Sequence, residues 1–182
     1  MRRIITLISL VIVFFVVNNF LYAAEKQIDT KGWGEAQWGM TKDQLLEAFK
    51  GQAIEIPKEL FVDHKTYKIA IINDYIIDGT RFTVTFFMSI KDDKLQRVHL
   101  RSSPSVESKY LQFQKLFIEK YGPPNLDKEN REGFSRTLVS TWFLTSSKIE
   151  LTYLYYPHDI NMAFLVVWYD DNKSAKSTLD KL

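Results

Sequence analysis

Apolar and polar residues alternate along several stretches of this chain, which is the pattern of β-strands with one buried face. The clearest case is 80–90, where Phe82, Val84, Phe86 and Met88 fall on one side. Asp78–Gly79 before it and the charged segment 91–94 after it are typical of turns. We predict further strands at the other runs with β character, which are 67–72, 95–101, 137–144, 148–156 and 161–169.

Two other stretches predict helices. Thr41 is followed three residues later by Gln44, the spacing of a capping box, so a helix is expected over 41–50 with Gly51 ending it. The second helix follows Pro104 and extends to Tyr121, ahead of a Gly-Pro-Pro stop. Its apolar residues are spaced by three or four positions and form one stripe: Val106, Tyr110, Phe113, Phe117 and Tyr121.

This order of elements predicts an α+β fold of two tandem αβββ units, 40–101 and 105–169, within a single domain spanning 40–169. We expect one mostly antiparallel sheet of about six strands, with both helices packed on one side. The charged segment 128–136 is interpreted as a loop, and 170–182 as a polar tail.

The predicted core contains the apolar residues in the inward phase of each element: Phe82, Val84, Phe86, Phe113, Phe117, Trp142, Leu151, Phe164 and Val166. The last predicted strand is apolar on both faces, although a sheet covered on one side should be polar on the other. Its second face is covered either by the chain itself or by a partner or lipid-like ligand. Within the chain, the cover would be the lead-in segment 25–39, with Trp33 and Trp38, or the loop around Phe61.

The first 24 residues have the order of a secretory signal peptide: Arg2 and Arg3, an apolar run, and small residues at Ala23 and Ala24. The apolar run of about 14 residues is short for a membrane span, which needs roughly 20. We therefore predict cleavage and a periplasmic or secreted protein without a stable membrane span. The alternative is an uncleaved anchor that tethers the domain to the inner membrane.

Charge and composition narrow the function. The chain has 24 Lys and Arg against 22 Asp and Glu, and two of the positive charges lie in the leader, so the body is near neutral. This balance argues against nucleic acid as the main partner. The absence of Cys excludes disulfides, thiolate metal sites and cysteine nucleophiles.

No motif for catalysis or metal binding occurs. The three histidines, His64, His99 and His158, lie in different segments without metal-ligand spacing, and His158 fits a turn. There is no G-x-S-x-G string. We predict no enzyme activity, no catalytic residue, no metal and no cofactor.

The binding candidates lie on the predicted sheet. Arg97, His99 and Arg101 alternate on one strand face, and Arg81 can join them from the preceding strand. Such a cluster either holds a carboxylate or phosphate or is simply solvated. Aromatic residues of the second unit would extend this face. The candidates for partner or ligand binding are Arg81, Arg97, His99, Arg101, Tyr156 and Tyr169.

The segment Trp38-Gly39-Met40-Thr41, leading into Gln44-Leu45-Leu46, resembles the G-M-T-x-x-Q opening of periplasmic proteins similar to the outer-membrane assembly lipoprotein BamE. Thr141-Trp142-Phe143 and the run 149–154 are similar to a strand segment of that family. Tandem units of this kind also resemble the β-lactamase inhibitor protein fold. The chain departs from the lipoprotein in lacking a lipobox Cys and in having two units. The resemblance implies a fold and a binding role, and it implies no catalytic residue.

These observations favour an exported protein-interaction module that binds a protein partner of the cell envelope through a sheet face. The alternative is a small-ligand carrier or sensor that holds an apolar or anionic molecule between sheet and loops.

Overall fold

The computed structural model describes residues 28–57, 65–156 and 162–173. The predicted signal peptide, the Phe61 loop, His64 and His158 lie outside these residues, as does 174–182 of the polar tail. No helix of the described part is both long enough and apolar enough to span a membrane.

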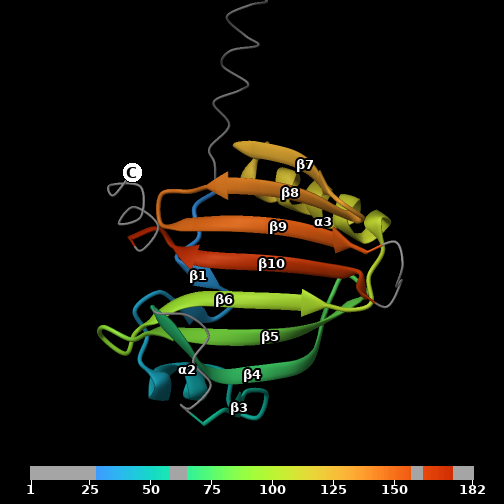
Figure 1. The fold of residues 1–182 in the computed structure, drawn as a ribbon. Coiled ribbons are helices and arrows are strands. Elements are labelled where there is room, and N and C mark those ends of the chain that lie inside the picture. Colours follow the sequence, from blue (N-terminus) through green and yellow to red (C-terminus); the bar gives the residue numbers. More distant parts are fainter. Residues whose placement is uncertain (1–27, 58–64, 157–161, 174–182) are drawn as a thin grey trace, which may run out of the picture.

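The fold is mostly β, with 51% of the described residues in strands and 19% in helices. The elements in chain order are β1 (Gly32–Trp33), β2 (Ala36–Gln37), α2 (Lys42–Ala48), β3 (Ile54–Glu55), β4 (Thr66–Ile77), β5 (Thr80–Ser89), β6 (Leu95–Ser102), α3 (Glu107–Tyr121), β7 (Leu126–Glu132), β8 (Ser135–Phe143), β9 (Ser147–Tyr155) and β10 (Phe164–Asp171). Strands β1 and β2 form a small hairpin, and the others form one antiparallel sheet in the order β3-β4-β5-β6-β10-β9-β8-β7 (Figure 1).

The predicted α+β class with tandem αβββ units is therefore wrong. In the structure a helix followed by four strands occurs in each half, and the halves join where β6 pairs with β10 to make an eight-stranded sheet. The prediction missed the two edge strands, β3 and β7. Strand β7 has the sequence LDKENRE and is exposed throughout, so no apolar alternation marks it. Its backbone ladder with β8 follows from the turn at Gly133, whose φ of 56° suits glycine.

Helix α2 begins and α3 ends where the sequence predicts, but α2 ends at Ala48, two residues before the predicted end at residue 50. Thr41 caps α2 by accepting a hydrogen bond from the Gln44 backbone, and the Gln44 side chain accepts one from the Thr41 backbone at 2.9 Å. This reciprocal pair is the predicted capping box. Helix α3 ends at Gly122, whose φ of 80° lies in the region that favours glycine.

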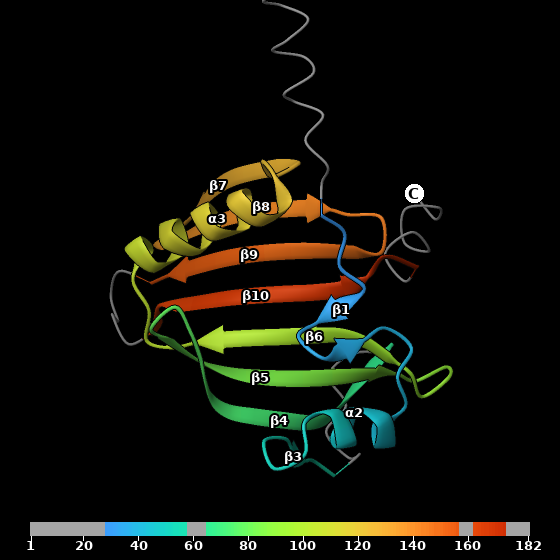
Figure 2. The same ribbon diagram turned by 180° about the vertical axis from the view of Figure 1, so that it is seen from behind.

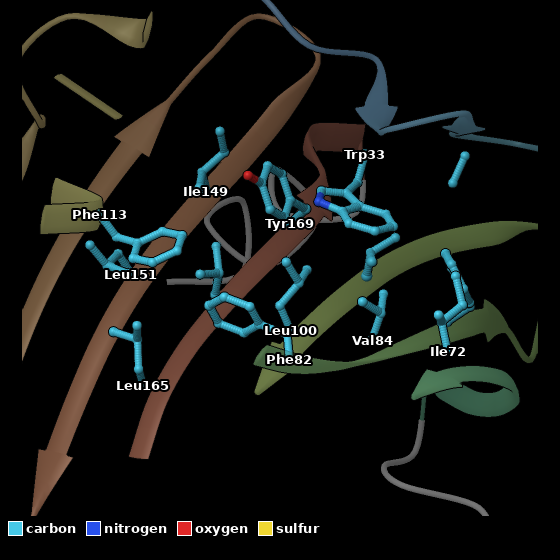
Figure 3. Close-up of a cluster of buried hydrophobic side chains, with 14 of the residues drawn as sticks. Trp33, Ile72, Phe82, Val84, Leu100, Phe113, Ile149, Leu151, Leu165 and Tyr169 are labelled. Carbon is cyan, nitrogen blue, oxygen red and sulfur yellow. The ribbon is translucent and has the colours of Figure 1, made fainter. Parts of the chain in front are cut away.

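Both helices and the β1–β2 hairpin lie on the same face of the sheet (Figure 2). We call this the helix-covered face and the opposite one the helix-free face. Trp33 of β1 is 8% exposed and packs against Phe49, Tyr75 and Phe86 (Figure 3 shows its place in the core). The lead-in segment therefore docks, as predicted, but it completes the helix-covered core instead of covering the other face.

Most of the predicted core is confirmed. Six of the predicted residues are buried: Phe82, Val84, Phe86, Phe113, Trp142 and Leu151. Phe117 is partly buried and packs edge-on against Trp142. The prediction that Phe164 and Val166 belong to the core is wrong by one position along the strand. Their neighbours Leu165 and Val167 point into the core instead, with exposed fractions of 0% and 1%. Phe164 and Val166 belong instead to the helix-free face.

Candidate functional site

Strand pairing places four of the sequence candidates on the helix-free face. His99 of β6 lies between Thr85 of β5 and Trp168 of β10. Arg101 and Arg97 flank it two residues away on the same strand. Arg81 lies at the start of β5, opposite Ile76 of β4. The predicted common face of these four residues is thus consistent with the register.

An aromatic and cationic cluster occupies the middle of this face. The His99 ring stacks on the Trp168 indole, with centroids 3.9 Å apart and planes at 23°. The Arg97 guanidinium lies 5.1 Å from the centre of the Trp168 ring, and its Nε donates to the Asp170 carboxylate at 2.5 Å. Phe87 contacts both rings and is only 1% exposed. This part of the face is a small second core, held by ring stacking and one ion pair.

His99 is held neutral in this cluster. Burial lowers its pKa from 6.5 to about 4, and the positive charges of Arg101, Lys68 and Arg97 act in the same direction. At neutral pH the imidazole therefore offers one N–H donor and one nitrogen acceptor without a charge. The three cations that lower the pKa of His99 come from two strands, Lys68 from β4 and the two arginines from β6.

A cavity of about 1130 Å³ opens beside this cluster, at the end of the sheet where β4 turns into β5 and where β6 leads into α3. We call it the β5–β6 cavity. Polar residues of the helix-free face line part of it, and the segment from Ser102 to Val106 lines another part. Its apolar lining consists of Ile56, Ile71, Phe82, Pro104 and Val106. The volume is slightly above the range of small-molecule sites, which is roughly 300–1,000 Å³.

The cavity is positively charged. Lys68, Arg81, Arg101 and Lys109 line it, and Asp74 is the one carboxylate among the described lining residues. Asp74 pairs with Arg81 at 3.3 Å, an exposed contact. Lys68 and Arg101 form no ion pair with any residue of the described chain; Arg101 instead lies 4.1 Å from the ring centre of Phe164. Three of its four cations, Lys68, Arg101 and Lys109, therefore have no counter-charge from the described residues, and the first two of them lie on the helix-free face.

One wall of the cavity is fixed by a contact between elements. Gln112 of α3 donates to the carboxylate of Asp78 in the β4–β5 turn, and Lys109 donates to the Gln112 amide oxygen at 3.0 Å. Two hydroxyls in the lining, those of Thr80 and Ser105, are buried without a hydrogen-bond partner in the described structure. Buried hydroxyls without a partner are uncommon in folded proteins.

Three sequence candidates lie outside the cavity lining. Tyr169 is 6% exposed and points into the helix-covered core, where burial and a hydrogen bond with Tyr121 raise the pKa of its phenol well above 10. Its expected place on the binding face is wrong for the same reason as that of Phe164 and Val166. Tyr156 is exposed but follows the last residue of β9. Arg97 lies on the face but is engaged with Asp170, and it does not line the cavity.

Sequence reasoning missed Lys68, Lys109 and Trp168. Lys68 lies next to Phe87 in the β4–β5 ladder, and its charged side chain on a predicted strand could have been noted as a member of the basic face. Lys109 belongs to α3, and only the folding of α3 against the β4–β5 turn brings it to the cavity. Trp168 shares a strand face with Phe164 and Val166, which the sequence places in the core, so it is not among the predicted binding residues.

Among the described residues no three His, Cys, Asp or Glu side chains gather in a way that could hold a metal ion. No family model, curated protein or solved structure matches the chain. The resemblance to BamE-like proteins and to the β-lactamase inhibitor fold therefore stays a hypothesis that rests on the short motifs alone.

Proposed function

We propose that this chain is an exported binding protein that holds a small molecule in the β5–β6 cavity, as a carrier or sensor. The observation that carries the proposal is the cavity itself, in which three cations without a counter-charge from the described residues meet an apolar lining. A site of this kind combines the two features of small-molecule pockets, apolar contact area and a few placed polar groups. Export is inferred from the signal-peptide pattern of the first 24 residues.

The structure weakens the argument for a protein partner on a continuous basic and aromatic sheet face. That argument needs Arg97, Arg101, Tyr156 and Tyr169 to share a surface, and Tyr169 is in the core. A protein partner remains the second candidate, favoured by the arginine and tryptophan of the helix-free face. These residue types dominate the energy of protein interfaces.

Native mass spectrometry of the mature protein, purified under mild conditions, tests the proposal. We expect a bound small molecule in the wild type and its loss in a Thr83→Trp variant. Thr83 is an exposed residue of β5 in the cavity lining, so an indole there fills space, and aromatic residues are well tolerated in strands. Thr137→Trp on β8, away from the cavity, is the matched control and should keep the molecule.

Two results would count against the carrier. A wild-type mass without any adduct contradicts it, and so does an adduct that survives in the Thr83→Trp variant. An adduct of protein size that is lost on mutating the helix-free face outside the cavity would support the second candidate instead.

A further inference from the structure

We propose that the ligand of the β5–β6 cavity is an amphipathic organic anion, whose negative group is bound between Lys68 and Arg101 and whose apolar part lies on the cavity lining. This inference rests on the proposed function and names the chemical class of its ligand. Three observations support it: the positions of Lys68 and Arg101 on the sheet, the polar groups between them, and the apolar lining around them.

The two cations lie on either side of one cross-strand row. Ile71, Thr85, His99 and Trp168 are neighbours across β4, β5, β6 and β10 and form this row. The row before it contains Lys68, Phe87, Arg97 and Asp170, and the row after it contains Thr83, Arg101 and Val166. Two positive groups therefore face the same strip of the sheet, from opposite sides of His99.

Of the three cations that act on His99, Arg97 alone has a carboxylate partner among the described residues. Asp170 neutralises Arg97, with side chains that are 15% and 30% exposed. Neither Lys68 nor Arg101 forms an ion pair with a carboxylate of the described residues. Two like charges around a shared strip repel each other, and an anion placed between them removes that repulsion and gains charge-assisted hydrogen bonds.

His99 completes the polar part of this strip. Burial, and after it the cations, keep the imidazole neutral, so it does not compete with Lys68 and Arg101 for the negative charge. It can still donate or accept one hydrogen bond. Thr83 and Thr85 contribute hydroxyl groups from β5. Together these groups can satisfy the oxygens of a carboxylate, sulfonate or phosphate group.

The rest of the cavity requires more than a bare anion. Ile71 lies within the strip, and Pro104 and Val106 line the cavity from the segment between β6 and α3. Val106 is 51% exposed, which is unfavourable for an apolar side chain. The apolar part of a ligand would cover it and exclude water from it. A ligand of this shape is an organic anion with an apolar body, and an inorganic anion would leave the apolar lining unused.

A matched pair of fluorescent probes tests this proposal. Anilinonaphthalene sulfonate carries a negative group, and N-phenylnaphthylamine has the same ring system without it. We expect saturable binding of the charged probe by the wild type. Arg101→Gln and Lys68→Gln should each weaken this binding about ten-fold, the loss of one charge-assisted hydrogen bond. The affinity for the neutral probe should be unchanged in both variants.

Three controls make the comparison specific. Arg131→Gln removes the same charge from β7, where the side chain is 74% exposed and remote from the cavity lining, and it should leave both affinities unchanged. Each variant is first shown to unfold at the wild-type urea midpoint, because partly folded states also bind the charged probe. Decanoate should displace the charged probe, whereas inorganic phosphate at the same concentration should not.

The outcomes separate this inference from the proposed function. If the charged probe binds equally well to wild type, Arg101→Gln and Lys68→Gln, or if phosphate displaces it as well as decanoate does, the amphipathic anion is wrong while the cavity remains the site. If neither probe binds, or if both bind the Thr83→Trp variant as they bind wild type, the cavity is not a binding site and the proposed function fails with it.

Discussion

Two alanine substitutions at adjacent valines test which face of β10 points into the core. Val167 is 1% exposed and lies between Leu100 of β6 and Leu151 of β9, inside the helix-covered core. Val166 lies between Arg101 and Thr152 on the helix-free face and is only partly buried. Val167→Ala and Val166→Ala remove the same atoms from the same strand, so their difference reports the environment and not the intrinsic strand preference.

The expected magnitudes follow from burial. Removing two buried methyl groups costs about 1.6 kcal/mol of transfer free energy, at about 0.8 kcal/mol each. The cavity left among Leu100, Leu151 and their neighbours raises the loss for Val167→Ala to about 2–3 kcal/mol. For Val166→Ala the side chain is partly in water already and leaves no enclosed cavity, so we expect a loss below about 1 kcal/mol.

Urea unfolding, followed by tryptophan fluorescence, measures both losses. The m-values should match that of the wild type, so that the shifts in midpoint report stability alone. A larger loss for Val166→Ala would show that β10 has the opposite phase, and equal losses would show that both of its faces are buried alike. The helix-free face described above would then be wrong, and with it the place of Trp168 beside His99.

Three further predictions concern separate features. His99 has a folded pKa of about 4 against 6.5 when unfolded, so its neutral state contributes stability above pH 6.5 that is lost as the pH falls towards 4. Lys68 of β4 and Arg97 and Arg101 of β6 face it. Between pH 7.5 and pH 4, the free energy of unfolding of His99→Gln should therefore fall by about 3 kcal/mol less than that of wild type, as measured by urea titration at each pH. If the unfolding free energies of the two proteins fall by the same amount over this range, the prediction is wrong. Thr41→Ala removes the capping box of α2 and should cost about 1 kcal/mol in the same assay, whereas Thr41→Ser should cost little. Trp33→Ala should cost about 3–5 kcal/mol, because the indole packs on three rings of the core; a loss below 1 kcal/mol would mean that the lead-in contributes little to the core.

The sequence predicted the elements that carry strong local signals. The helix at Thr41 has its capping box, and the stripe from Tyr110 to Tyr121 ends at Gly122. Strand β5 alternates well enough that Phe82, Val84 and Phe86 were placed correctly in the core. The basic face of β6 followed from the alternation of Arg97, His99 and Arg101. In each case the pattern is local, so a short window of residues contains the information.

By itself the sequence determined where the chain turns, which segments become helices and which face of a clearly alternating strand is buried. It could not determine the phase of β10, because every residue from Phe164 to Tyr169 is apolar or aromatic and either face could be inward. Pairing with β6 and β9 decided it, by aligning Val167 with Leu100 and Leu151. The tertiary structure likewise decided the edge strand β7, which is held by backbone hydrogen bonds that no side-chain pattern records. It also decided the candidate site, because Lys68 is far from His99 and Arg101 in the sequence and comes near them only through the ladder of β4, β5 and β6.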